Sequence, residues 1–186
     1  EIVGNEDCLY LNIYAPAYTI SSVPNENNKL PVMVWIHGGG NTSGMTSEYN
    51  PQKLVASQNV IVVTISYRLG IFGWFSHPEL RNRSNGLDAS ANFGLLDQIK
   101  ALEWLRNNIE NFGGDKNNIT IFGESAGGQN VIALYVSPLA KGLFHRAISQ
   151  SGGITLTSIA DAEDIDRVAF PLKAVSYTHL RAHETN

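Results

Sequence analysis

The chain has 186 residues, of which 43% are hydrophobic and 16% charged, and this composition is typical of a globular domain rather than a disordered or collagen-like chain. Its 13 basic and 17 acidic residues leave a net charge of -4. Because no block of Lys or Arg could neutralise a run of phosphates, we expect no nucleic-acid partner. The longest apolar runs, residues 32–36 and 60–65, fall far short of the roughly 20 residues of a membrane-spanning helix, so we expect no transmembrane segment.

Cys8 is the only cysteine, so these residues can form neither a disulfide with one another nor a cysteine-rich metal site. We expect no metal and no cofactor. The sequence leaves the redox compartment and the localisation open.

The two ends of the chain differ in character from its middle. Residues 1–14 begin at Glu1 with a strand-like alternation and no leader-like charged or apolar region, so any targeting peptide would lie upstream. Residues 175–185 read VSYTHLRAHET, which has neither strand alternation nor a helical apolar face and resembles a translated sequencing adaptor. We therefore interpret residues 175–186 as a non-native tail, with a native polar tail as the alternative, and expect no chemistry from His179 or His183.

Short apolar runs rich in β-branched residues predict buried strands at residues 31–36 and 60–66. Two further strands are expected at 118–122 and 146–150. Continuous apolar runs of this length are typical of strands that are buried on both faces of a parallel sheet.

Helical patterns lie between these strands, at residues 51–57, at 131–136 and in one longer segment. The longer segment has apolar residues at spacings of three and four, namely Leu95, Ile99, Leu102, Leu105 and Ile109. Gly113 and Gly114 are expected to end it. Residues 25–29 and 76–90 are polar and Asn-rich and predict loops. Strands that alternate with helices indicate an α/β fold, a mostly parallel sheet with helices on both faces.

Gly123-Glu124-Ser125-Ala126-Gly127 fits the pattern G-x-S-x-G between a predicted strand and a predicted helix. In that setting the pattern is a nucleophile elbow, a turn so tight that side chains at Gly123 and Gly127 would collide with their neighbours. Ser125 would then project from the carboxyl end of the sheet as the catalytic nucleophile, above the positive end of the following helix. A plain glycine-rich helix entry is the alternative.

His37-Gly38-Gly39-Gly40 follows the predicted strand at 31–36. Glycines let the backbone turn its N–H groups toward one point, as an oxyanion hole requires, and we expect Gly39, Gly40 and Ala126 to supply the donors. Taken alone, this run would equally suit a flexible turn. His37 is expected to hold the loop and not to act as the base, because the base follows the serine in this chain order.

Five segments of the chain together resemble the type-B carboxylesterases, a family that includes para-nitrobenzyl esterases and cholinesterases. They are EDCLYLN at residues 6–12, HGGG at 37–40, YRLG at 67–70, NFGLLDQ at 92–98 and FGESAGG at 122–128. The resemblance runs from residue 1 to about residue 160 and implies an α/β-hydrolase fold. We therefore expect residues 1–174 to form the amino-terminal, partial domain of such an enzyme.

The resemblance also implies Ser125 as nucleophile, the donors Gly39, Gly40 and Ala126, and a small-molecule ester as the binding partner. It leaves the oligomeric state open. Arg68 and Asp97 match a salt bridge of the family, and we expect Arg68→Ala to impair folding before chemistry. Asn41 departs from the family, where Phe is common, which could alter the acyl side of the pocket. Some members bond the cysteine that matches Cys8 to one farther upstream.

An activated serine needs a histidine as base and a carboxylate that orients the histidine. In this fold both follow the serine, the acid first. His145 is the only credible downstream histidine and has no suitably placed acid before it, so we expect the acid and the base to lie outside these residues and the isolated chain to be inactive. Two alternatives are a non-catalytic, cholinesterase-like adhesion protein, disfavoured by the presence of Ser125, and an esterase of the hormone-sensitive group, disfavoured by EDCLYLN and NFGLLDQ.

Overall fold

The computed structural model describes residues 5, 7–153 and 157–169. It divides into two compact units, one made of Glu1–Trp74 and Asn92–Thr155 and the other of Phe75–Ala91 and Leu156–Asn186. The predicted tail at 175–186, with His179 and His183, lies outside the described residues. The predicted domain limit at residue 174 stays a prediction.

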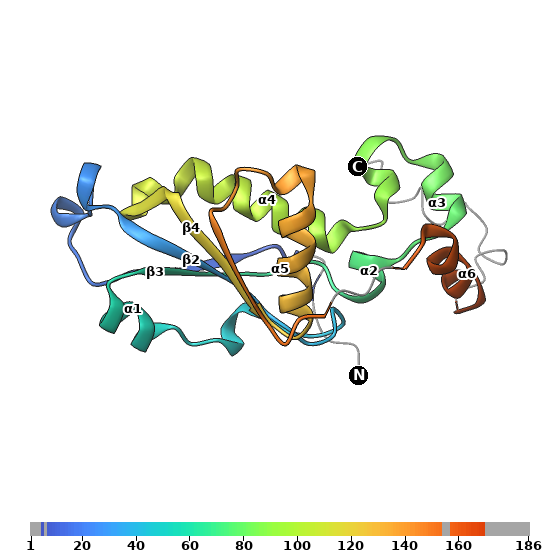
Figure 1. Cartoon of the computed structure of the whole chain (residues 1–186), viewed down its shortest axis with the longest axis horizontal. Coiled ribbons are helices and arrows are strands. Elements are labelled where there is room, and N and C mark those ends of the chain that lie inside the picture. Colours follow the sequence, from blue (N-terminus) through green and yellow to red (C-terminus); the bar gives the residue numbers. More distant parts are fainter. Residues whose placement is uncertain (1–4, 6, 154–156, 170–186) are drawn as a thin grey trace. The chain divides into compact units, whose positions relative to one another are not determined.

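A five-stranded sheet in the order β1-β3-β2-β4-β5 forms the centre of the first unit (Figure 1). The strands are β1 (Leu11–Tyr14), β2 (Leu30–Ile36), β3 (Ile61–Ile65), β4 (Gly114–Glu124) and β5 (Arg146–Gln150). Strand β1 pairs antiparallel with β3, whereas all other pairs are parallel. The predicted mostly parallel sheet is therefore confirmed, with one antiparallel edge strand.

Helices cover both faces of this sheet. Helix α1 (Gln52–Gln58) lies on the opposite side from α4 (Phe93–Asn108), as Figure 1 shows. The side chains of β2 alternate between two hydrophobic clusters. The cluster on the α4 side also includes residues of helix α5 (Ala126–Val136), and its β2 members are Val32, Val34 and Ile36. The cluster on the α1 side contains Met33 and Trp35.

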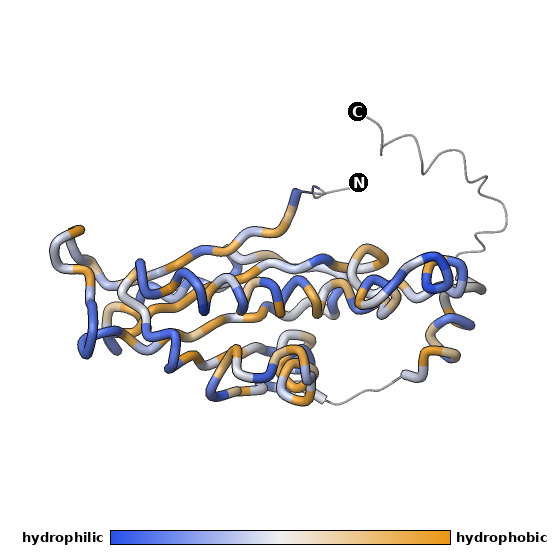
Figure 2. Tube along the Cα trace, turned by 90° about the horizontal axis from the view of Figure 1, so that it is seen from above, coloured by the Kyte–Doolittle hydropathy of each residue, from blue (hydrophilic) through white to orange (hydrophobic). Residues whose placement is uncertain are grey.

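The inner position of β3 explains its unbroken apolar run. All five of its residues are fully buried, because helices pack on both of its faces and a neighbouring strand lies along each edge. Figure 2 shows this distribution as predominantly hydrophobic strands beside helices that carry both kinds of residue. None of the helices in the described ranges is long and apolar enough to cross a membrane.

Single-turn and short helices complete the first unit: η1 (Ile20–Ser22), η2 (Glu26–Asn28), η3 (Thr46–Glu48), α2 (Gly70–Trp74), η5 (Ile109–Phe112) and η6 (Pro138–Ala140). The predicted loop at 25–29 thus contains one 3-10 turn. Gly113 ends η5 with a φ of 79°, in the left-handed region that favours glycine. Gly114 is already the first residue of β4, so the expectation that it ends the long helix is wrong.

The second unit overturns the expectation of a plain loop at residues 76–90. It contains α3 (Pro78–Arg83), η4 (Gly86–Ser90) and α6 (Ile159–Ala169). Helix α3 begins with proline at its first turn, and the ring Nδ1 of His77 accepts the N–H of Glu79 at 3.2 Å, which caps the helix. Arg81 then pairs with Glu163 of α6, Nε to Oε1 at 2.6 Å. Capping and a long-range ion pair stabilise a helix that has no apolar periodicity.

Candidate active site

Ser125 follows the last residue of β4 and is the N-cap of α5. Its φ of 56° and ψ of -121° are rare for a residue with a side chain, and such strain persists only where the surroundings impose it. Its N–H donates to the carbonyl of Gln150 in β5 at 2.9 Å, and its own carbonyl accepts the N–H of Gln129 at 3.0 Å. The side chain is exposed. The fold therefore presents the hydroxyl to solvent on a turn that is held from both sides.

The two glycines that flank the serine have no room for a side chain. A Cβ at Gly123 would lie 2.6 Å from the carbonyl of Gly127, and a Cβ at Gly127 would lie 2.1 Å from the carbonyl oxygen of Ile36. Because real Cβ atoms do not approach backbone so closely, β2, β4 and α5 can meet here only through glycine.

The glycine loop after β2 packs directly against this turn. A Cβ built on Gly38 would lie 2.8 Å from the carbonyl oxygen of Glu124 and 3.3 Å from the Cβ of Ser125. The fold therefore brings together the two segments that the sequence analysis paired, although they are far apart in the chain.

Hydrogen bonds orient the peptide groups of this loop. The carbonyl of Gly38 lies 2.9 Å from the ring Nδ1 of His37, and the carbonyl of Gly39 accepts the N–H groups of Thr42 and Ser43, each at 3.1 Å. In a trans peptide the N–H points opposite to the C=O. The N–H groups of Gly39 and Gly40 therefore point away from His37 and from the turn at Thr42 and Ser43.

The three amides expected as donors are unpaired. Within the described part of the chain, the N–H groups of Gly39, Gly40 and Ala126 donate no hydrogen bond. The φ angles of Gly39 and Gly40, 90° and 63°, need the freedom of glycine. Unpaired backbone N–H groups are of the kind that can stabilise negative charge on an oxygen atom.

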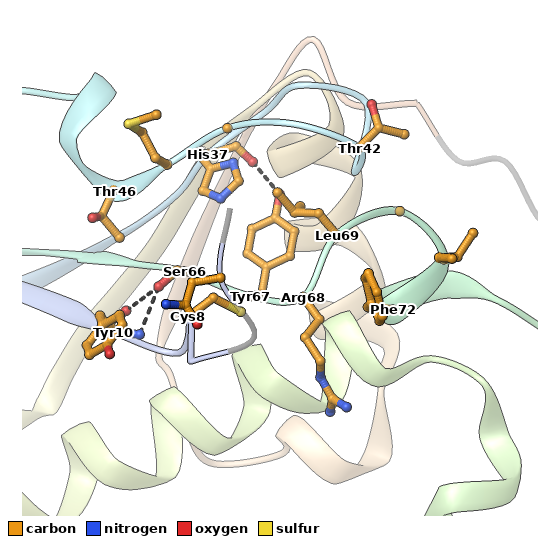
Figure 3. A pocket seen from close by; sticks show the side chains of 15 residues that line it. Cys8, Tyr10, His37, Thr42, Thr46, Ser66, Tyr67, Arg68, Leu69 and Phe72 are labelled. Atoms are coloured by element: carbon orange, nitrogen blue, oxygen red, sulfur yellow. Dashed lines mark hydrogen bonds between the residues drawn. The ribbon is translucent and has the colours of Figure 1, made fainter. Parts of the chain in front are cut away.

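His37 is buried behind the loop and does not face the solvent, with 2% of its surface exposed. Its ring stacks on Tyr67 at 4.4 Å between centroids, and the Tyr67 hydroxyl donates to the His37 carbonyl at 2.7 Å. Figure 3 shows the two rings and this hydrogen bond. Burial lowers the pKa of His37 and raises the pKa of Tyr67. Burial thus disfavours the charged form of the His37 ring, which packs beneath the glycine loop.

A cavity of about 790 Å³ opens beside these rings, but Ser125 does not line it. Its walls include Cys8, Tyr10, Ser66 and Phe72 (Figure 3). The Nε2 of His37 is buried and has no hydrogen-bond partner in the part of the chain that the structure describes. Because Ser125 is not among the residues that line this cavity, the cavity does not contain the candidate nucleophile.

Arg68 and Asp97 form a two-pronged ion pair that connects the segment after β3 to α4. Nε and one terminal nitrogen of Arg68 each lie 2.7 Å from a carboxylate oxygen of Asp97, and the Arg68 N–H donates to the same carboxylate at 3.0 Å. The guanidinium also lies 5.0 Å above the ring of Phe93. Only 7% of the Asp97 side chain is exposed, against 38% for Arg68. The pair is buried on its acidic side only.

His145 lies at the wrong end of the sheet to serve Ser125. Its N–H donates to the carbonyl of Ile119 at 2.8 Å, and its Nδ1 accepts the N–H of Ile119 at 3.1 Å. Ser125 comes six residues after Ile119 along β4, which at about 3.3 Å per residue amounts to about 20 Å. A base must lie within hydrogen-bond reach, so His145 cannot be one in this fold.

Two residues of the site were not singled out from the sequence. Asn130 is 3% exposed on α5, and its Nδ2 donates to the Oδ1 of Asn41 at 2.9 Å. Tyr67 was noted only as part of a motif. The available signal was weak: Asn130 directly precedes the predicted helix at 131–136, and a polar side chain that becomes buried normally has a partner. Among the described residues, no group of three His, Cys, Asp or Glu could hold a metal ion.

The profile of the carboxylesterase family matches residues 1–180. The chain belongs to the carboxylesterase family. It is 53% identical over 165 residues to carboxylesterase 1D of Rattus norvegicus, covering 89% of this chain and 27% of that protein. It is 55% identical over 148 residues to the medium-chain fatty acyl-CoA hydrolase precursor of Anas platyrhynchos, covering 80% of this chain and 24% of the relative. This carboxylesterase chain therefore spans about a quarter of the length of these relatives.

Solved structures agree with the family. A PNB esterase superposes with a TM-score of 0.80 at 43% identity, covering 95% of this chain and 36% of the esterase. A thermophilic PNB esterase gives a TM-score of 0.81 at the same identity. The carboxylesterase chain thus has the α/β-hydrolase fold, and it covers 36% and 34% of these two esterase chains.

Proposed function

We propose that the full-length protein containing this chain hydrolyses carboxylic esters through an acyl-serine intermediate, with Ser125 as the nucleophile. One observation carries the proposal: an exposed serine on a strained turn lies against a glycine loop, and the amides of Gly39, Gly40 and Ala126 have no partner among the described residues. The names of the relatives, carboxylesterases and an acyl-CoA hydrolase, support the same reaction class.

The chemistry follows from these groups. The hydroxyl oxygen of Ser125 attacks the ester carbonyl carbon, and the carbonyl oxygen becomes an oxyanion. The N–H groups of Gly39, Gly40 and Ala126 hydrogen-bond that oxygen, and each aimed donor lowers the barrier by about 3 to 4 kcal/mol. The positive end of α5 adds to the effect. Collapse of the intermediate expels the alcohol and leaves an acyl-serine, which water then hydrolyses.

The proton of Ser125 needs an acceptor that the described residues do not supply. In this fold the acid and the histidine follow the nucleophile, and His145 is about 20 Å away along the strand. We propose that both partners belong to the part of the full-length protein outside this chain. Without them the hydroxyl is a weak nucleophile at neutral pH.

The test measures hydrolysis of para-nitrophenyl butyrate by the full-length protein and its Ser125→Ala variant. We expect the variant to lose at least about 10⁴-fold in kcat, because the members of a catalytic triad act as a unit. Ser57→Ala is the matched control, since that serine is exposed on α1 and its hydroxyl bonds only to neighbours on the same helix, the Leu54 carbonyl and the Gln58 side chain, among the described residues. Mass spectrometry of protein treated with a fluorophosphonate should place the adduct on Ser125.

The isolated 186-residue chain gives a second check. We expect it to show neither a burst nor turnover of para-nitrophenyl butyrate. A burst would contradict the proposed location of the base. Full activity of the Ser125→Ala preparation would instead mean that a contaminating hydrolase cleaves the ester. That result would favour the second hypothesis, in which the protein is non-catalytic and binds a partner.

A further inference from the structure

The glycine loop needs anchors because its central residues have no side chains. At its start, the His37 carbonyl accepts the Tyr67 hydroxyl at 2.7 Å. At its end stands Asn41, with a φ of 58° and a carbonyl that accepts the N–H of Gly70 at 2.7 Å. The Asn41 side chain provides a further anchor, because its Oδ1 accepts the Nδ2 of Asn130 at 2.9 Å and lies 3.4 Å from the Tyr67 hydroxyl.

Asn130 differs from the other anchors in the element that carries it. It lies on α5, the helix that begins at Ala126 directly after the serine. One turn of helix, about 6 Å, separates Asn130 from Ala126. The hydrogen bond between Asn41 and Asn130 therefore joins the loop that carries Gly39 and Gly40 to the helix that carries Ala126.

We propose that Asn41 and Asn130 form a positioning clamp that sets the distance between the two parts of the oxyanion hole. The inference rests on the proposed function, since it assigns a role in the same site. In the proposed clamp neither side chain contacts the reacting atoms. Both act through the backbone amides, which must lie at hydrogen-bond distance from one oxygen to be effective.

The hydrogen bond between Asn41 and Asn130 restricts the position of the whole glycine loop. Asn130 is buried, with 3% of its surface exposed, and a buried amide that loses its partner is costly, which favours the closed clamp. Gly38, Gly39 and Gly40 resist displacement less than residues with side chains would. A side-chain bond at the end of the loop therefore limits where the free amides can lie.

The magnitude follows from the cost of misplacing a donor. Removing one oxyanion-hole donor costs about 10² to 10³ in kcat. Loss of a clamp that only positions the donors should lower kcat by less than loss of a donor does. We therefore expect Asn41→Ala and Asn130→Ala each to lower kcat by about 10- to 100-fold. KM should change by less than about threefold, because the lost stabilisation belongs to the transition state.

The experiment uses the full-length protein with para-nitrophenyl butyrate and four variants: Asn41→Ala, Asn130→Ala, the double variant and Asn108→Ala. Asn108 is the matched control, since its exposed amide donates to the Trp104 carbonyl on α4 and touches no part of the site. The double variant should fall no more than about threefold below the weaker single variant, because both changes break one bond. A trifluoromethyl ketone, which forms an oxyanion on Ser125, should bind more weakly by the same factor as kcat falls.

The outcomes separate the two proposals. If the wild-type protein neither hydrolyses the ester nor reacts at Ser125, the proposed function fails and the clamp fails with it. If the wild type is active but both single variants keep kcat within about threefold, or their effects multiply in the double variant, the clamp is refuted alone. Asn41 is half-buried on a loop, so Asn41→Ala decides the matter should Asn130→Ala fail to fold.

Discussion

Removal of the Arg68 guanidinium tests whether the ion pair with Asp97 supports folding more than chemistry. In Arg68→Ala the carboxylate of Asp97, whose side chain is 7% exposed, would keep only the Arg68 backbone N–H as a partner among its three hydrogen bonds to that residue. Breaking a fully buried pair on one side costs about 3 to 5 kcal/mol. Because 38% of the Arg68 side chain is exposed, water replaces part of the loss, and we expect about 2 to 3 kcal/mol.

Urea denaturation of the full-length protein, followed by tryptophan fluorescence, measures this loss as a lower midpoint. Lys100→Ala is the control on the same helix, since its ion pair with Glu103 is exposed and should contribute less than about 1 kcal/mol. At low urea the kcat of Arg68→Ala should stay within about threefold of the wild type. A midpoint equal to that of the control, or a large fall in kcat at unchanged stability, would refute the reasoning.

Two further predictions concern the loop and the elbow. Gly127→Ala should prevent folding or cost more than about 3 kcal/mol, because its Cβ would lie 2.1 Å from the Ile36 carbonyl oxygen. Gly153→Ala is the control and should unfold like the wild type in a thermal melt, because a Cβ there meets no other described residue within 4 Å beyond its chain neighbours. Equal melting temperatures of Gly127→Ala and Gly153→Ala would contradict the packing. Burial lowers the pKa of His37 from 6.5, so the unfolded chain binds its proton first, and the free energy of unfolding should fall as pH drops below about 6.5. His37→Asn, which keeps an N–H donor for the Gly38 carbonyl, should show a flatter pH dependence in urea titrations; an unchanged dependence would assign the effect to other groups.

Much of the fold was predictable from local pattern. The runs at 31–36 and 60–66 predicted strands buried on both faces, and the structure places them in the middle of the sheet as β2 and β3. The segment at 76–90 was not predictable in this way. Its helix α3 depends on a cap from His77 and on an ion pair to Glu163, and neither leaves an apolar period in the sequence.

The candidate site, like the fold, has features that the local sequence predicts and features that it does not. The glycine spacing around Ser125 and the glycine run after β2 pointed to the close backbone packing that the structure has there, because a backbone that turns tightly or approaches another backbone favours glycine. The catalytic roles of both segments are our proposal. No comparable pattern in the sequence pointed to the proposed role of Asn41. The family resemblance directed attention to the acyl side of the pocket, whereas the structure directs the Asn41 side chain to Asn130.

The sequence by itself therefore determined the chain's family and its buried strands, and it pointed to the residues proposed for the site, because steric limits and hydrophobic burial act on neighbours in the chain. Only the tertiary structure decided which side chains hold the proposed backbone donors in position. Asn41 and Asn130 are 89 positions apart, and a single hydrogen bond between such distant residues depends on how β2, β3 and α5 pack, which no local pattern records.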